Sequence, residues 1–451
     1  MLLIANAYLM NPAAGEEGCC DILIRGERIL RIEQGLYEKL RAKPMQQEQL
    51  EKISEAEESD ITVEDVDVID GSGLIAAPGL VDVHSHFRDP GFTYKEDIVS
   101  GARAAARGGY TTVVLMANTK PAVDSAETLS YVLKKGRETD IHIETCATVT
   151  MGMQGRELTA METLYEQGAA GFTDDGVPIL DAELVRKAMK KAKKLDVPIS
   201  FHEENPAYIQ NNGVNAGAAS VHFGIGGSPR EAEIDLVGRD LELALETGAC
   251  INIQHISSKE AVELVRLAKR KGGDIHAEAT PHHFTLTEVA VIKYGTLAKM
   301  NPPLREESDR RAIIEGLRDG TIDMIATDHA PHSREEKEKS ITEAPSGIIG
   351  LETALALGIT ELVDKGELTM MSLLGKLTCN PAGIYHLDAG YLAEGGPADI
   401  VLFDPKEEFA VKDFSSKSVN SPFTGWKLKG VVKYTICGGK VVYQSRMENA
   451  V

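Results

Sequence analysis

Histidine and aspartate side chains stand where short apolar segments of this sequence end. Segment 79–86 closes on His84-Ser85-His86. Residues two apart on a strand face the same side, so these two imidazoles are able to contact one ion. Such a pair alone is as typical of two ordinary polar core residues as of a metal site. Further residues that follow or close other apolar segments favour the metal site, namely Asp175, His202, His255 and Asp328.

The types of these side chains indicate which metal they would bind. Imidazoles and carboxylates without a thiolate suit Zn²⁺, with Mn²⁺, Co²⁺ or Fe²⁺ as substitutes. The set exceeds the ligands of one tetrahedral catalytic ion that must keep a position open, so two ions sharing a bridging carboxylate fit better. Two such ions bind a water and lower its pKa toward neutrality. The competing interpretation is a set of polar residues that each cap a strand or bond a neighbour.

A scaffold must bring these residues together. Segments rich in Val, Ile and Ala alternate with helical patterns from about residue 78 to about residue 370, which is typical of repeated strand–helix units and a parallel sheet. The predicted strands are 79–86, 111–117, 141–148, 169–173, 197–202, 250–255, 274–279 and 322–327. They predict an α/β fold, a closed (β/α)8 TIM barrel. Barrel enzymes assemble their sites at the carboxyl ends of the strands, where the His and Asp residues stand.

The two ends of the chain predict a second, smaller domain. Residues 1–77 and about 386–451 read as short β-like runs broken by glycine turns, so we expect them to pair into one small β-sandwich domain. Residues 78–385 would then be the catalytic barrel. Between the first β runs and the barrel, about residues 36–63 are rich in Gln and Glu with little apolar periodicity. An inserted helix and a mobile loop both remain open for this acidic insertion.

Composition excludes several classes of protein. The formal net charge of −21 opposes binding to nucleic acid, which requires cationic contacts to phosphates. It does not exclude an anionic small molecule, since metal ions and arginines can set a local positive field. No apolar run approaches the roughly 20 residues of a membrane span, and the first residues do not resemble a signal peptide. The cysteines are scattered without a C-x-x-C pair, which indicates reduced thiols. We therefore expect a cytoplasmic protein with no nucleic-acid or membrane partner.

Several motifs together resemble type I bacterial dihydroorotases, and the resemblance covers nearly the whole chain. These motifs are HSHFRDPG (84–91), MANT (116–119), FTDDG (172–176), KMNPPLR (299–305) and ATDHAPH (326–332). The resemblance implies a zinc-dependent interconversion of N-carbamoyl-L-aspartate and L-dihydroorotate in pyrimidine biosynthesis. It also implies two Zn²⁺ ions per chain, a homodimer, and association with aspartate transcarbamoylase in some active members.

The resemblance also implies a role for each metal-site residue. His84 and His86 would bind one zinc ion, and His202 and His255 the other. Asp175 would bridge the two ions. Asp328 would be an axial ligand of the first ion and the general acid/base, which requires a carboxylate near the bridging oxygen.

Substrate contacts carry over in the same way. A planar guanidinium such as that of Arg88 suits a planar carboxylate, because the two can form a bidentate pair. Two positions depart from the family pattern: Ala117 stands where proline is usual, and Ser346 where phenylalanine is usual. The second departure would loosen the pocket wall, although a backbone contact would survive it. The positions that match the family's substrate site are His86, Arg88, Asn118, Asn301 and His332, with the backbone around Ser346 and Gly347.

Relatives with the same fold are the nearest alternatives. Hydantoinases or dihydropyrimidinases and allantoinases commonly bridge their metals with a carboxylated lysine from the fourth strand. No lysine occurs between Lys135 and Lys187, and Asp175 stands in the matching place. Another alternative is an inactive scaffold for aspartate transcarbamoylase, but such chains have typically lost metal ligands that are intact here.

Other charged and histidine residues favour a structural interpretation. His282 and His283 are adjacent, so they face opposite sides of a strand, and the family does not use them as ligands. The charged run 333–339 is typical of a solvated loop, although its position after His332 also allows a mobile lid. Surface or core packing is the default for the remaining histidines, His142, His222, His276 and His386.

Overall fold

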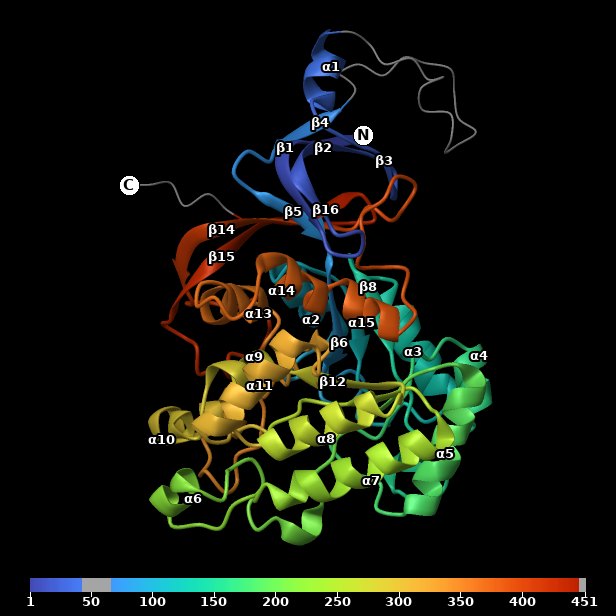
Figure 1. Ribbon diagram of the computed structural model, residues 1–451, viewed down its shortest axis with the longest axis vertical. Coiled ribbons are helices and arrows are strands. Elements are labelled where there is room, and N and C mark those ends of the chain that lie inside the picture. Colours follow the sequence, from blue (N-terminus) through green and yellow to red (C-terminus); the bar gives the residue numbers. More distant parts are fainter. Residues whose placement is uncertain (43–65, 446–451) are drawn as a thin grey trace.

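The computed structural model describes residues 1–42 and 66–445, which contain both halves of the terminal domain and the whole predicted barrel (Figure 1). The acidic insertion predicted at 36–63 begins with helix α1 (Leu36–Ala42). The rest of it, from residue 43 onward, lies outside the described residues. In the described ranges, no helix has the length and apolar character needed to cross a membrane.

The predicted barrel is confirmed. Its parallel strands are β6 (Leu80–Ser85), β7 (Tyr110–Leu115), β8 (His142–Thr145), β9 (Phe172–Thr173), β10 (Ile199–Phe201), β11 (Ile251–Ile253), β12 (Ile275–Ala279) and β13 (Met324–Ile325). Ladder hydrogen bonds join neighbouring strands in two runs, one from β6 through β7 to β8 and the other from β9 through β10, β11 and β12 to β13. Two further contacts close the ring: the Thr173 amide donates to the carbonyl of Ala147, and the His86 amide to the carbonyl of His329. Each strand lies inside or within one residue of its predicted segment.

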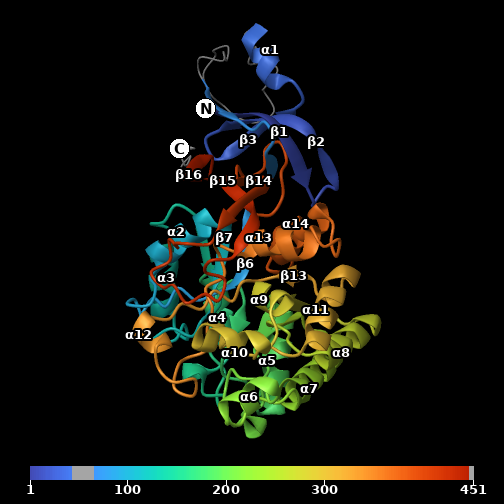
Figure 2. The same ribbon diagram turned by 90° about the vertical axis from the view of Figure 1, so that its left-hand side faces the viewer.

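Helices follow the strands and surround them (Figures 1 and 2). Local sequence sets their ends: Asp97 caps α2 in a capping box with Ser100, and Gly248 ends α7 in the left-handed conformation. The barrel helices are α2 (Ile98–Arg107), α3 (Ala126–Gly136), α4 (Met161–Glu166), α5 (Ala182–Leu195), α6 (Ala218–Phe223), α7 (Glu231–Thr247), α8 (Lys259–Arg270), α9 (Pro281–Thr285), α10 (Val289–Tyr294), α11 (Glu307–Asp319), α12 (Arg334–Lys337), α13 (Ala354–Gly358), α14 (Met370–Leu377) and α15 (Cys379–Ile384).

The chain ends form the expected β-sandwich domain, which lies above the barrel in Figure 1. Its strands are β1 (Leu2–Asn11), β2 (Glu16–Arg25), β3 (Arg28–Glu33), β4 (Asp67–Asp70), β5 (Ile75–Pro78), β14 (Ile400–Ala410), β15 (Lys427–Cys437) and β16 (Lys440–Gln444). The two termini meet where β5 pairs antiparallel with β14. Only one residue separates β5 from β6, so the sheet that contains β5 and β14 holds the start of the first barrel strand in place. The domain boundaries 77/78 and 385/386 stay predictions.

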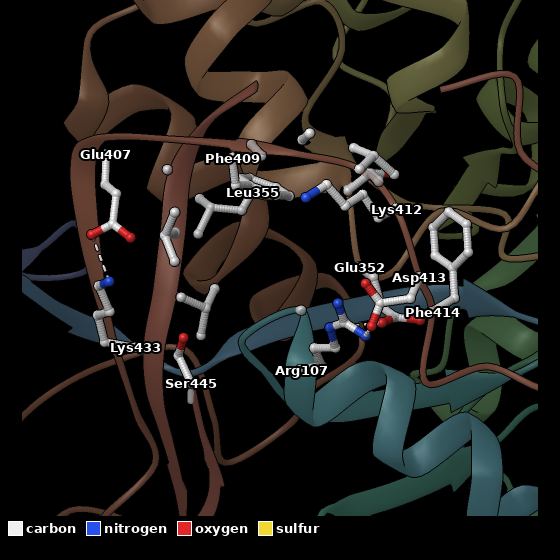
Figure 3. A pocket seen from close by; sticks show the side chains of 18 of the residues that line it. Arg107, Glu352, Leu355, Glu407, Phe409, Lys412, Asp413, Phe414, Lys433 and Ser445 are labelled. Atoms are coloured by element: carbon white, nitrogen blue, oxygen red, sulfur yellow. Dashed lines mark hydrogen bonds and ion pairs between the residues drawn. The ribbon is translucent and has the colours of Figure 1, made fainter. Parts of the chain in front are cut away.

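A cavity of about 610 Å³ lies where the barrel meets the terminal domain, between α13 and strands β14 and β15 (Figure 3). Two of its cations are paired: Arg107 lies 3.2 Å from Glu352, and Lys433 lies 2.5 Å from Glu407. Phe409 and Leu355 line the wall between them. The positive charges that these two cations bring to this cavity are therefore balanced within it.

Candidate metal centre and substrate cavity

The predicted metal-site residues all lie at the carboxyl-terminal mouth of the barrel. His84 is the fifth residue of β6, and His202, His255 and Asp328 come one to three residues after β10, β11 and β13. The side chains of all six predicted residues are buried, with 6% or less of the residue surface exposed. The distances between them form two groups that share His84.

The first group joins β6 to β13. One donor atom each from His84, His86 and Asp328 lies within 4.8 Å of the others. His86 Nε2 is 2.9 Å from Asp328 Oδ1, and His84 Nε2 is 3.5 Å from the same oxygen. These are the three residues that the family resemblance assigns to one ion.

The second group is centred on Asp175. His84 Nε2, His202 Nδ1 and His255 Nε2 lie 3.4, 3.6 and 3.9 Å from Asp175 Oδ1. The other carboxylate oxygen, Oδ2, lies 3.5 Å from His86 Nε2. Asp175 therefore stands between the histidines of both predicted ions.

Local hydrogen bonds explain why Asp175, and not its neighbour Asp174, enters the centre. Asp174 accepts hydrogen bonds from the amides of Val149 and Thr150, at 2.8 and 3.1 Å, and from the Thr150 hydroxyl. Burial raises the pKa of Asp174 to about 6, against these hydrogen bonds. Asp175 has the opposite orientation, because consecutive residues leaving a strand face opposite ways.

The backbone is strained where two of the candidate ligands lie. His255 and Asp328 have φ angles of +31° and +44°. Non-glycine residues rarely adopt such angles, which cost on the order of 1–3 kcal/mol each and concentrate at functional sites. The surrounding barrel therefore holds these two side chains in positions that the free backbone would avoid.

The donor set fits a bound cation. Glu278 binds His84 Nδ1, which leaves Nε2 buried, without a hydrogen bond, and facing the oxygens of Asp175 and Asp328. Burial opposes a charge on His84, but the carboxylates of Glu278, Asp328 and Asp175 outweigh it and hold the pKa of His84 well above its usual value. The cluster thus stabilises a positive charge at Nε2, which a proton or a metal ion can supply.

A cavity of about 330 Å³ opens beside these ligands. Arg88 and His332 lie together in its wall, with Arg88 Nη2 3.5 Å from His332 Nε2. Gly347 abuts His332: a Cβ on this glycine would lie 2.5 Å from His332 Cδ2. Of the predicted substrate residues, the ones that line the cavity are His86, Arg88, Asn118, Asn301, His332 and Ser346.

Hydrogen bonds tie the substrate-side amides to the metal side. Asn118 Nδ2 donates to Asp175 Oδ2 at 2.9 Å, and its Oδ1 lies 3.0 Å from His86 Nδ1. Asn301 Nδ2 lies 3.1 Å from His202 Nε2. The amides therefore orient the candidate ligands as well as line the cavity.

Charges in the cavity wall favour a neutral His332. Burial lowers the pKa of His332 to about 3, and Arg88, Lys95 and Lys337 add to this effect. A neutral imidazole offers both a donor and an acceptor to a bound molecule. The guanidinium of Arg88 then supplies a positive charge on this wall.

Sequence reasoning missed Glu278, which supports the centre from behind. This buried carboxylate is the last residue but one of β12. It binds His84 Nδ1 and accepts a hydrogen bond from the His255 amide at 3.2 Å. A carboxylate behind a histidine fixes the tautomer that presents the other nitrogen. The position of Glu278 near the end of a predicted strand could have indicated a role at the site. The sequence did not show which face of the strand its side chain lies on.

His282 and His283 lie in helix α9 and not on a strand. Several of the histidines interpreted as structural have partners outside the metal cluster. His283 Nδ1 lies 2.7 Å from Thr280 Oγ1, and Nε2 lies 3.0 Å from the carbonyl of Pro302. His142 lies 3.1 Å from Asp399 in the terminal domain. The charged run 333–339 contains helix α12, of which Lys337 is buried rather than solvated. A lid function for this run stays a prediction.

Comparison with known proteins identifies the family. The model described as the amidohydrolase family matches residues 75–442. A dihydroorotase of Clostridioides difficile strain 630 is 52% identical over 445 residues, covering 99% of this chain and 100% of that protein. A dihydroorotase of Clostridium acetobutylicum is 51% identical over 449 residues with the same coverage.

Solved structures share the fold at lower identity. An L-hydantoinase (dihydropyrimidinase) from Arthrobacter aurescens superposes with a TM-score of 0.82 at 23% identity, covering 98% of this chain and 96% of that one. A dihydropyrimidinase from Brevibacillus agri NCHU1002 gives 0.79 at 22% identity, covering 98% and 95%. These likenesses concern the fold alone. Because the sequence relatives align over almost the whole of both chains, the chain belongs to the amidohydrolase family and, within it, to the dihydroorotases.

Proposed function

We propose that this protein interconverts N-carbamoyl-L-aspartate and L-dihydroorotate, the cyclisation step that makes the pyrimidine ring. The observation that supports this substrate is Arg88, whose half-buried guanidinium lies in the wall of the cavity beside the cluster around Asp175. Both substrates carry a carboxylate that a guanidinium can bind in a bidentate manner. The relatives named dihydroorotase support the reaction.

We propose two Zn²⁺ ions as the cofactor. His84, His86 and Asp328 would hold one ion, His202 and His255 the other, and Asp175 would bridge them. When bound, such a pair polarises the amide carbonyl and makes a nucleophile of water at neutral pH.

The residues of the chain have separate tasks in this reaction. Arg88, with the neutral His332 beside it, would bind the substrate carboxylate, and Asn301 would orient the ring. Asp328 would take the proton of the attacking water on a carboxylate oxygen and deliver it to the departing ring nitrogen. In the synthetic direction the same carboxylate would take the proton from the attacking nitrogen and return it to the departing oxygen, since both directions pass through the same transition states.

Hydantoinase, dihydropyrimidinase and allantoinase activities remain the alternatives. They are not favoured, because the bridging position after β9 holds Asp175 and no lysine occurs between Lys135 and Lys187. The deciding experiment loads the purified protein with zinc and follows the ultraviolet absorbance of dihydroorotate. Consumption of dihydroorotate with no turnover of hydantoin or allantoin supports the proposal, and the reverse preference rejects it.

We also propose a cytoplasmic location and a homodimer. A complex with aspartate transcarbamoylase is compatible with an active site of this kind. Light scattering on the purified protein, alone and mixed with the transcarbamoylase of the same source, measures both assemblies. A monomeric mass would reject the homodimer.

Arg88→Lys is expected to lower kcat/KM for dihydroorotate by a factor of about 10 to 10³, because it keeps the charge and loses the bidentate fork. Steady-state kinetics measures this. The matched control is Arg103→Lys, the same change at an exposed position of α2, which should leave kcat/KM unchanged. An Arg88→Lys protein as efficient as the parent would show that the substrate carboxylate binds elsewhere.

Glu278→Gln is expected to lower metal affinity by a factor of about 10 to 100, because the neutral amide no longer draws charge onto His84 through Nδ1. Titration of the metal-free protein with zinc, against a competing chelator, gives the affinity. Glu138→Gln makes the same change at an exposed position and should bind zinc like the parent. Equal affinities for all three proteins would refute a supporting role for Glu278.

A further inference from the structure

Two buried lysines lie beside the substrate cavity and have no place in the mechanism above. Lys299 lines the cavity directly, and Lys337 projects from α12. Only 4% and 5% of their surfaces are exposed. Lysine is rarely buried without a carboxylate partner, because removing its charge from water is costly.

Among the described residues, neither lysine has a carboxylate within ion-pair distance. Lys299 Nζ donates to the carbonyl of Ala344 at 2.7 Å. Lys337 Nζ donates to the carbonyls of Pro345 and Gly347 at 2.9 and 3.1 Å. The nearby carboxylate of Glu336 instead binds Lys95 and the Tyr94 hydroxyl, at 2.8 and 3.0 Å. The cavity of Figure 3 differs in this respect, because Arg107 and Lys433 there face carboxylates.

The lysines hold the segment that forms one wall of the substrate cavity. Their acceptors span residues 344–347, and the Gly347 amide also donates to the Lys299 carbonyl at 3.0 Å. A Cβ on Gly213 would lie 3.0 Å from Lys299 Cγ, so the lysine stem is packed closely between this loop and the wall. The two ammonium groups are thus fixed in place.

The surroundings of the two lysines disfavour their positive charges. Burial lowers the pKa of Lys337 to about 7, and the charge of Lys299 lowers it further than the neighbouring Glu336 raises it. Burial also lowers the pKa of Lys299. An anion in the adjacent cavity would relieve this repulsion.

We propose that Lys299 and Lys337 are positioning residues for substrate recognition: they fix the 344–347 wall and supply an unbalanced positive charge that selects the more anionic substrate. This inference rests on the proposed function. N-carbamoyl-L-aspartate carries two carboxylates and L-dihydroorotate one. A charge that acts through space contributes in proportion to the ligand charge. The pair therefore favours binding of the open-chain substrate over the ring.

Lys299→Met tests the proposal, because methionine has a similar length and no charge. We expect KM for dihydroorotate to rise about 10-fold, equivalent to about 1.4 kcal/mol, and KM for N-carbamoyl-L-aspartate to rise clearly more, toward 100-fold. The kcat values should change less than KM. Zinc content should stay that of the parent. Lys339→Met is the matched control, since it removes the same charge from an exposed position two residues beyond Lys337, and both its KM values should be unchanged.

Lys337→Met provides a second, independent variant in case Lys299→Met fails to fold, and should show the same order of effects. Equal rises in both KM values would overturn the charge role, because a merely loosened wall does not distinguish one carboxylate from two. Unchanged KM values in both variants would overturn the proposal entirely. Failure of the parent protein to turn over either compound would instead overturn the proposed function, which separates the two outcomes.

Discussion

Asp175→Ala is expected to lose most of its bound metal and all measurable turnover. Asp175 lies 3.4 to 3.9 Å from three histidine nitrogens through one oxygen, and its other oxygen lies 3.5 Å from His86. Removing this carboxylate takes a ligand from each of the two proposed ions and the negative charge from between them, so the two cations would repel each other. The measurement is metal content by atomic emission, together with dihydroorotate turnover, on protein purified with zinc present.

The control for Asp175→Ala is Asp140→Ala, an exposed aspartate in the loop before β8, which should keep the metal content and activity of the parent. Thermal unfolding separates loss of metal from loss of fold, because the Asp175→Ala protein should still unfold cooperatively. Full metal content with normal turnover in Asp175→Ala would reject the bridging assignment. Full metal content without turnover would indicate that a residue other than Asp175 bridges the ions.

The barrel could be predicted because its signals are local. Most strands lie in short segments rich in apolar residues, and residues such as Gly248 mark the ends of helices, so the order of the elements can be followed along the sequence. The strand ends then place His84, His202 and His255 at one mouth, since all parallel strands of a barrel end on the same side.

The support behind the site could not be predicted in the same way. Glu278 and Lys337 act through contacts with residues far away in the chain or on another loop, such as Glu278 with His84. Lys337 belongs to a run of charged residues that are usually exposed to water. Only its burial in α12 against the 344–347 segment distinguishes it from an ordinary surface lysine. Such roles depend on packing between elements, which strand and helix patterns do not encode.

Asp328→Asn is expected to retain most of its zinc and its substrate affinity while turnover falls by at least the roughly 10²-fold typical of a lost general acid/base. Asparagine has nearly the same shape and still offers an oxygen to a metal ion, but it cannot accept and return a proton. The strained backbone at Asp328, with φ of +44°, tolerates asparagine better than most residues. The substitution therefore removes the proton transfer with little change to the fold.

Three measurements on Asp328→Asn separate chemistry from metal binding: zinc content, the dissociation constant of orotate as a non-reacting carboxylate ligand, and kcat in both directions. Asp328→Ala is the companion variant, because it removes the oxygen as well and should lose zinc along with turnover. The position of Asp328 Oδ1, 2.9 Å from His86 Nε2 and 3.5 Å from His84 Nε2, makes both roles possible for one carboxylate. If Asp328→Asn lost its zinc in parallel with its turnover, the residue would be a ligand only. If it kept near-normal turnover, the proton would travel through another group. Retained zinc and orotate binding with a low kcat is the one combination that assigns the proton to Asp328.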